Sequence, residues 1–138
     1  MVDWENIAQR LLGASVSLKP LAGEYDLNFL ATLDKQSCIL KVMRPDCEMP
    51  FVDMQIKAIM HLKKSDKSLP IPDVLSFKDD RFIATENDRL VWAQSQLEGG
   101  ALATIKEKPE ALLDELGSYM ARIDKCLENF DHSELGRL

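Results

Sequence analysis

The spacing of apolar residues changes at Ala14, and this change constrains the fold more than any other feature of the sequence. Before Ala14 the apolar positions have helical spacing, whereas short β-prone stretches separated by turn-forming residues follow it. One helical segment, from near Pro50 to about Lys64, interrupts these stretches. The stretches are Ser15–Pro20, Leu27–Leu33, Ser37–Met43, Arg81–Glu86 and Arg89–Ser95. This order predicts an α+β fold in which a five-stranded antiparallel sheet packs against one helix.

Two further helices are predicted, one on each side of the sheet segment. A short helix within residues 1–13 has Asp3 as a suitable N-cap and Gly13 as a suitable stop. A long helix begins near Pro109 and carries a continuous apolar stripe, formed by Leu112, Leu116, Tyr119, Ile123, Leu127 and Phe130. The chain therefore divides into a leading helix, a sheet-containing lobe, a linker and a terminal helical segment, at residues 1–13, 14–96, 97–108 and 109–138.

Turn-forming residues place the hairpins of the predicted sheet. The segment Asp34-Lys35-Gln36 closes one hairpin, and the pair Asn87-Asp88 closes another, because Asn and Asp tolerate the positive φ of a tight turn. Val74–Phe77 adds a short extended piece between the second predicted helix and the last two strands. The sheet is thus expected to consist mainly of neighbouring strands that follow one another in the chain.

Composition excludes several classes of function. The chain has 17 basic and 23 acidic side chains, and its net charge of −6 has the wrong sign for binding a nucleic-acid backbone. Its N-terminus has no long apolar run, so we expect neither a signal peptide nor a membrane span, and we predict a cytoplasmic protein. The 3 cysteines, Cys38, Cys47 and Cys126, lack Cys-x-x-Cys spacing, which argues against a disulfide framework and a zinc site.

Four features together suggest a phosphate-binding site. Gly23, between the first two strands, would let backbone amides approach an anion. Lys41 lies in the apolar third strand and would bring a point charge to the phosphates. The following helix offers Gln55 or Asp53 to hold this lysine. The end of the last strand offers backbone groups for the edge of an adenine, at Ala93–Leu97 with Gly99 and Gly100 beyond it.

Each feature also has a purely structural explanation. Gly23 can serve only as a turn residue, and Lys41 can extend its stem along the apolar strand into solvent. Gln55 can be a surface residue, and the two glycines at 99 and 100 can be a plain linker. The remaining candidates for chemistry are expected to be structural as well, with Trp4 and Trp92 packing in the core or at its edge and His61 and His132 on the surface.

Four segments carry a resemblance to a known family. They are "LAGEYDLNFL", "CILKV", "FVDMQIKAIMHL" and "LPIPDV", and together with the order of elements they resemble the small lobe of the aminoglycoside phosphotransferase-like kinases, in particular the hydroxylysine-kinase-like branch. The similarity runs from about residue 14 to residue 132. "AQSQLEGGAL" resembles the hinge of these kinases, and "LGSYMARIDKCLENFDH" resembles the first long helix of their large lobe.

The resemblance implies ATP as the ligand and assigns residues to it. A family loop that covers the nucleotide maps onto Gly23, Glu24, Asp26 and Asn28, and the family's phosphate-binding lysine maps onto Lys41. The glutamate that steadies this lysine in most kinases is replaced here by Gln55, a neutral amide that gives no charge compensation. The hinge implies nucleotide contacts at Gln94, Gln96 and Leu97.

The family's catalytic loop is not found in these 138 residues. His132-Ser133-Glu134 mimics the start of a His-x-Asp loop but has Glu in place of Asp. The resemblance therefore implies the nucleotide-binding portion of an ATP-dependent kinase for a small-molecule hydroxyl, with Mg²⁺ only in the complete enzyme. The alternative is a non-catalytic interaction or regulatory domain that docks through its C-terminal helix, and a third possibility is a small α+β domain with no link to nucleotides. The apolar stripe of the last helix predicts contact with a missing large lobe, a partner domain or a second copy of the chain.

Overall fold

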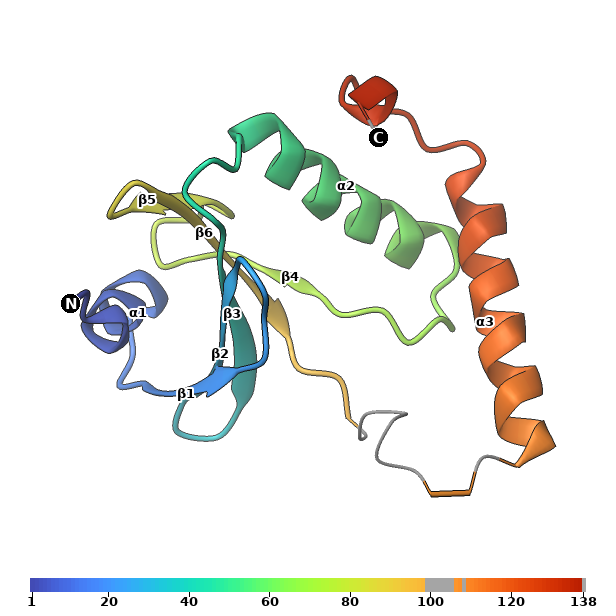
Figure 1. The fold of residues 1–138 in the computed structure, drawn as a ribbon, viewed down its shortest axis with the longest axis horizontal. Helices are drawn as coiled ribbons and strands as arrows, with labels where there is room; N and C mark the ends of the chain where they lie inside the picture. Colours follow the sequence, from blue (N-terminus) through green and yellow to red (C-terminus); the bar gives the residue numbers. More distant parts are fainter. Residues whose placement is uncertain (99–105, 108, 138) are drawn as a thin grey trace.

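The computed structural model describes residues 1–98, 106–107 and 109–137. Three helices and a sheet make up the fold, and Figure 1 shows the sheet between α1 and α2, with α3 beyond α2. The elements are α1 (Trp4–Leu12), β1 (Ser17–Leu21), β2 (Leu27–Thr32), β3 (Ser37–Val42), α2 (Met49–Ser65), β4 (Val74–Leu75), β5 (Ala84–Glu86), β6 (Arg89–Ser95), α3 (Glu110–Leu127) and a short 3-10 turn, η2 (Leu135–Arg137). The predicted α+β class is confirmed.

The sheet has six antiparallel strands in the described part of the chain, one more than the predicted five. Its order is β1-β2-β3-β6-β4, and β5 pairs with β6 on the same edge as β4. The additional strand is Val74–Leu75, the extended piece that the sequence indicated, which pairs with Gln94 and Ala93 of β6. Two residues are too few to show an alternating pattern, so only the pairing reveals this strand.

The two predicted hairpin turns are present. Asn87 and Asp88 have φ values of 52° and 62°, the left-handed conformation that a two-residue turn between β5 and β6 requires. At the β2–β3 turn, the Leu33 amide donates a hydrogen bond to the carbonyl of Gln36. Strand β5 begins at Ala84, three residues after the predicted start at Arg81, because Arg81 instead closes a local turn with Asp79.

One face of the sheet, which we call the closed face, is covered by α1. It presents the buried side chains Ala31, Cys38, Leu40, Val42, Val91 and Ala93, which form one core cluster with Ala8 and Leu11 of α1. Both ends of helix α1 are capped as predicted. At its start the Asp3 carboxylate accepts a hydrogen bond from the Asn6 amide, and at its end Gly13 adopts the left-handed conformation of a C-cap. This face therefore forms the main core of the domain.

The opposite face, which we call the open face, is covered only in part. Residues directly paired across antiparallel strands share a face, so the register places on it Lys19, Leu21, Asn28, Leu30, Ile39, Lys41, Trp92 and Gln94. Helix α2 packs over the Trp92 end of this face through Val52 and Ile56, with Met43 and Leu90 completing a second core cluster. The other open-face side chains are half-buried or exposed.

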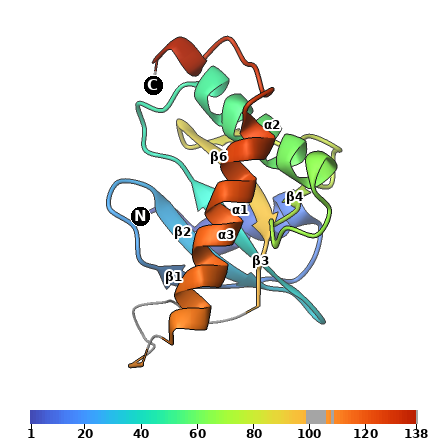
Figure 2. The same ribbon diagram turned by 90° about the vertical axis from the view of Figure 1, so that its right-hand side faces the viewer.

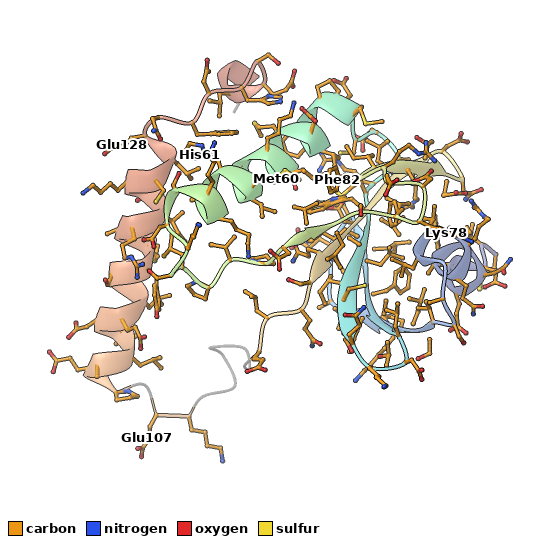
Figure 3. All side chains as sticks on the ribbon, turned by 180° about the vertical axis from the view of Figure 1, so that it is seen from behind. Met60, His61, Lys78, Phe82, Glu107 and Glu128 are labelled. Carbon is orange, nitrogen blue, oxygen red and sulfur yellow. The ribbon has the colours of Figure 1, made fainter. Side chains whose placement is uncertain are left out.

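Helix α3 is attached to α2 mainly through polar contacts near its own C-terminal end. The Nε2–H of His61 on α2 reaches the carbonyl of Cys126 at 2.8 Å and Asn129 Oδ1 at 3.0 Å. Arg122 donates two hydrogen bonds to Asp66 Oδ2, at 3.0 and 2.7 Å. Figure 3 shows His61 pointing from α2 toward this end of α3, close to Glu128, and Figure 2 shows α3 running past the end of α2.

The expectation that both histidines lie on the surface is wrong. His61 is half-buried, and its ring lies 5.4 Å from the ring of Phe130. The His132 side chain is only 10% exposed and bonds Asp53 Oδ2 at 2.9 Å, while its Nδ1 accepts a hydrogen bond from the Glu134 amide. Both rings join α2 to the C-terminal segment, a role that depends on pairs 65 and 79 residues apart in the sequence.

Candidate functional site

Lys41 stands near the middle of the open face. Strand β3 alternates strictly, with Cys38, Leu40 and Val42 buried on the closed face and Lys41 half-buried on the other. The strand register puts Asn28 of β2 on one side of Lys41 and Trp92 of β6 on the other. The predicted placement of this lysine on one face of an apolar strand is therefore confirmed.

An apolar strip beside Lys41 was not recognised in the sequence. Leu30 and Ile39 are directly paired on the open face and half-buried, and Leu21 is 39% exposed at the edge of the same face. A partly exposed apolar surface next to a cation suits a ligand with a flat apolar part and a negative part. The sequence contains part of this signal, because Ile39 is two residues from Lys41 in the same strand and must share its face. Only the pairing of β2 with β3 adds Leu30 to the strip.

The glycine loop between β1 and β2 is a tight turn. A Cβ atom on Gly23 would lie 2.6 Å from the carbonyl oxygen of Asp26 and 2.8 Å from Asn28 Nδ2. The close approach of the backbone to itself therefore requires glycine at this position. Glu24 and Tyr25, at the tip, are exposed.

The polar side chains of this loop hold it to the sheet. Asp26 Oδ1 accepts a hydrogen bond of 2.8 Å from the Arg44 amide just after β3, and Asn28 Nδ2 donates to the carbonyl of Ala22 at 3.5 Å. Asn28 Oδ1 is buried and has no hydrogen-bond partner among the described residues. Asn28 is the direct cross-strand partner of Lys41 in the β2–β3 register, so this unpaired acceptor belongs to a residue next to the lysine.

Of the two α2 residues considered for holding Lys41, Asp53 is occupied elsewhere. Its carboxylate pairs with His132 at 2.9 Å and with Lys57 at 3.0 Å. The hydrogen bond from His132 is the largest cause that lowers the pKa of Asp53 below its usual value, and Lys57 lowers it further. Asp53 therefore belongs to the attachment of the C-terminal segment.

Gln55 is on the sheet-facing side of α2 and half-buried, three residues after the buried Val52. The described residues include no hydrogen bond between Gln55 and Lys41. The Lys41 ammonium instead lies over the ring of Trp92, with Nζ 5.7 Å from the ring centroid. The predicted core position of Trp92 is confirmed, since it is 2% exposed.

The C-terminal end of β6 completes the site on the sheet side. Gln94 is half-buried and paired with Ile39 and Val74, whereas Gln96 and Leu97 are exposed beyond the strand. Gly99 and Gly100 lie outside the described residues. A contact that the sequence did not indicate braces this end, because the Ser95 hydroxyl accepts a hydrogen bond of 2.8 Å from the Asp73 amide.

Other features of the described chain bear on the class of function. No group of three or more His, Cys, Asp or Glu side chains is arranged to hold a metal ion in the parts that the structure describes. None of the described helices is long and apolar enough to cross a membrane. The cysteines form no disulfide, and burial raises the pKa of the Cys38 thiol.

No family model and no curated protein sequence matches this chain. Among solved structures, the amicoumacin kinase hAmiN in complex with AMP-PNP, Ca²⁺ and Ami is similar over 93% of this chain and 40% of its own, with a TM-score of 0.73 and 16% identity. A microcompartment-associated aminopropanol kinase matches 94% of this chain and 41% of its own, with a TM-score of 0.73 and 18% identity.

An aminoglycoside phosphotransferase, APH(4)-Ia, in complex with AMP-PNP and hygromycin B, matches 95% of this chain and 40% of its own, at 22% identity and a TM-score of 0.63. The chain thus spans about 40% of the length of these structures. At such identities the comparisons establish the fold. The resemblance to the aminoglycoside phosphotransferases is confirmed at that level, and the chain has a kinase-like fold.

Proposed function

We propose that the open face binds ATP and that the chain is the nucleotide-binding portion of a phosphotransferase acting on a small-molecule hydroxyl. The observation that carries the proposal is Lys41, a half-buried cation on an apolar sheet face that the described helices cover only in part. Similar structures with AMP-PNP support a nucleotide as the ligand of this fold.

The proposed binding mode follows from the layout of the open face. The purine lies against Leu30 and Ile39, and its edge meets the chain at Gln94, Gln96 and Leu97 beyond β6. The phosphates meet the ammonium of Lys41 and the backbone amides of the loop at Gly23 and Glu24. Asp26 and Asn28 act by holding that loop in place.

The chemistry of phosphoryl transfer needs more than this surface. Transfer requires a residue that orients the acceptor hydroxyl and oxygen ligands that hold Mg²⁺ between the phosphates. The described residues contain no cluster suited to a metal ion. We therefore assign Mg²⁺ to the bound nucleotide, and we assign acceptor binding and catalysis to a complete enzyme. This chain covers about 40% of the length of the related structures.

The test is a titration of isotopically labelled protein with Mg²⁺ and ATP, in which NMR monitors the chemical shifts of the backbone amides. We expect shifts at 23–28, Lys41 and 94–97 in the wild type, and a dissociation constant roughly 10- to 100-fold higher in Lys41→Ala, because a charged hydrogen bond to phosphate is lost. The matched control is Lys35→Ala, which removes an exposed lysine from the β2–β3 turn at the far end of the same strands.

The proposal fails if millimolar ATP shifts no amide, or if the two lysine variants bind ATP equally well. Shifts confined to the closed face or to α3 would also contradict it. A retained shift pattern in Lys35→Ala, with loss in Lys41→Ala, assigns the phosphates to the open face.

A second candidate function is a docking domain, and the surface of α3 favours it. None of the residues of α3 is buried, and its Leu113, Leu116 and Met120 are 47%, 40% and 59% exposed. Such a surface is expected to contact a large lobe, a partner domain or a second copy of the chain. Sedimentation velocity over a concentration series is expected to show self-association. The double variant Leu116→Lys/Met120→Lys should lose it, and the control Ser118→Lys should keep it. A monomer at all concentrations would exclude a second copy of the chain as the partner of this surface.

A further inference from the structure

Lys41 has an aromatic neighbour where a carboxylate would be expected. Its Nζ lies 5.7 Å from the centroid of the Trp92 ring, within the range of a cation–π interaction. The contact is built into the sheet, because Lys41 and Trp92 are directly paired residues of β3 and β6. Cross-strand partners have adjacent Cβ atoms, so this pairing brings the lysine stem and the indole together.

None of the ion pairs in the described part of the chain involves Lys41. Asp53 is held by His132 and Lys57, and the Asp26 carboxylate accepts the Arg44 amide. Gln55 is neutral, and no hydrogen bond among the described residues joins it to Lys41. The ring of Trp92 is thus the group that the structure provides for the ammonium.

Trp92 is fixed in place. Its side chain is 2% exposed and packs with Val52 and Ile56 of α2, and its indole Nε1–H donates a hydrogen bond of 3.4 Å to the sulfur of Met43. A ring held by packing on one side and by a hydrogen bond at its edge cannot follow a moving lysine. Among aromatic side chains, the indole has the strongest attraction for a cation.

We propose that Trp92 is the positioning residue of Lys41, holding its ammonium on the open face while the ammonium binds the phosphates of a nucleotide. The inference rests on the proposed ATP site. A ring and a carboxylate differ in one respect, because the ring attracts the cation through its quadrupole and carries no net charge. Lys41 therefore keeps its whole positive charge for the phosphates, which explains how Gln55 can replace an acid on α2.

The experiment changes the charge distribution of the ring and leaves its shape nearly unchanged. Trp4→Phe leaves Trp92 as the only tryptophan, and it is then replaced biosynthetically by mono-, di- and trifluorotryptophan. Each fluorine withdraws electron density from the ring face and weakens its attraction for a cation. We expect the dissociation constant for Mg²⁺-ATP to rise at each step, by roughly three- to tenfold in total.

The control is the same fluorine series in Lys41→Met, in which the dissociation constant is expected to be independent of fluorination. Thermal unfolding of each protein separates an effect on binding from an effect on the core. In the trifluoro protein, Gln55→Glu is expected to recover affinity, because a carboxylate on the sheet-facing side of α2 supplies the attraction that the ring has lost.

Two results would overturn the inference: a dissociation constant that does not change with fluorination, or one that falls, which would mean that Lys41 must leave the ring to bind. A second measurement separates this failure from that of the proposed function. The ε-methylene protons of Lys41 should be shifted upfield by the indole ring without any nucleotide. If that shift is present but ATP does not bind, the proposed function is wrong. If the shift is absent, the positioning role of Trp92 is wrong.

Discussion

The two faces of the sheet are built from the same strands but differ in what covers them. The closed face carries Leu40 and Val42, both 0% exposed, against α1. Their neighbours Ile39 and Lys41 in the same strand point to the open face and remain half-buried. Alternate residues of one strand therefore have different surroundings, because one set packs in the core and the other lies on the face that we propose binds the nucleotide.

The comparison also separates two kinds of helix. Helix α1 is joined to the closed face by apolar packing through residues such as Ala8 and Leu11. Helix α2 covers one end of the open face by apolar packing and is held from its outer side by polar contacts from His132 and Arg122. The open face thus has a cover that depends partly on a distant part of the chain.

The largest expected effect tests the difference between the faces within one strand. Leu40→Ala should lower the free energy of unfolding by about 3 kcal/mol, because it leaves a cavity in a core that cannot collapse around it. Ile39→Ala, one residue away, should cost about 1 kcal/mol, since its side chain is only partly buried. Urea denaturation measures both, and equal losses would contradict the division into a closed and an open face.

The glycine loop gives the next largest effect. Gly23→Ala should cost roughly 1 to 2 kcal/mol, because the new Cβ would lie 2.6 Å from the Asp26 carbonyl oxygen and must displace backbone. Amide shifts should change around 22–28 and at Arg44 and leave the closed face unaffected. Gly117→Ala on α3 is the matched control, since a Cβ atom added at Gly117 would meet no neighbouring atom within 4 Å. This change should stabilise the helix by about 0.5 kcal/mol or more.

A smaller effect tests the helix of the closed face. Asp3→Ala removes the side chain that accepts the Asn6 amide and should lower stability by about 1 kcal/mol. Because this helix lies on the face remote from Lys41, the affinity for Mg²⁺-ATP should stay unchanged. A loss of affinity in Asp3→Ala, measured by the same amide titration, would show that the two faces are coupled.

The smallest effect concerns the outer attachment of α2. The pKa of Asp53 is lowered by the His132 hydrogen bond and by Lys57, so its contribution to stability is present above the ordinary aspartate pKa of about 3.9 and is lost as the pH falls below it. Asp53→Asn should therefore lose less stability on acidification than the wild type. The difference should be roughly 0.5 kcal/mol or less, because the pair is partly exposed.

Urea denaturation at pH 7 and at pH 3 measures this difference. Some acid sensitivity should remain in the variant, since the pKa values of Asp66 and Asp79 are also lowered, mainly by hydrogen bonds from Ser68 and Arg81. A steeper loss of stability in Asp53→Asn than in the wild type would contradict the assigned sign.

Much of the fold could be predicted from local pattern. The switch of period at Ala14, the turn residues Asn87 and Asp88, and the caps Asp3 and Gly13 all act within a few residues of the chain. The position of Lys41 on one face of an apolar strand follows from alternation alone. Local backbone chemistry determines such features, and they can be read without knowing which elements meet.

The partners of Lys41 are different in kind. Leu30, Asn28 and Trp92 join it only through the pairing of β3 with β2 and β6, and Asp53 meets His132 across 79 residues of sequence. Strand register and helix docking are decided by burial of the whole core, because a shift of one residue in register would turn every side chain to the other face. The sequence by itself thus determined most of the elements and the position of the cation on its strand, and only the tertiary structure decided that an indole ring stands beside it.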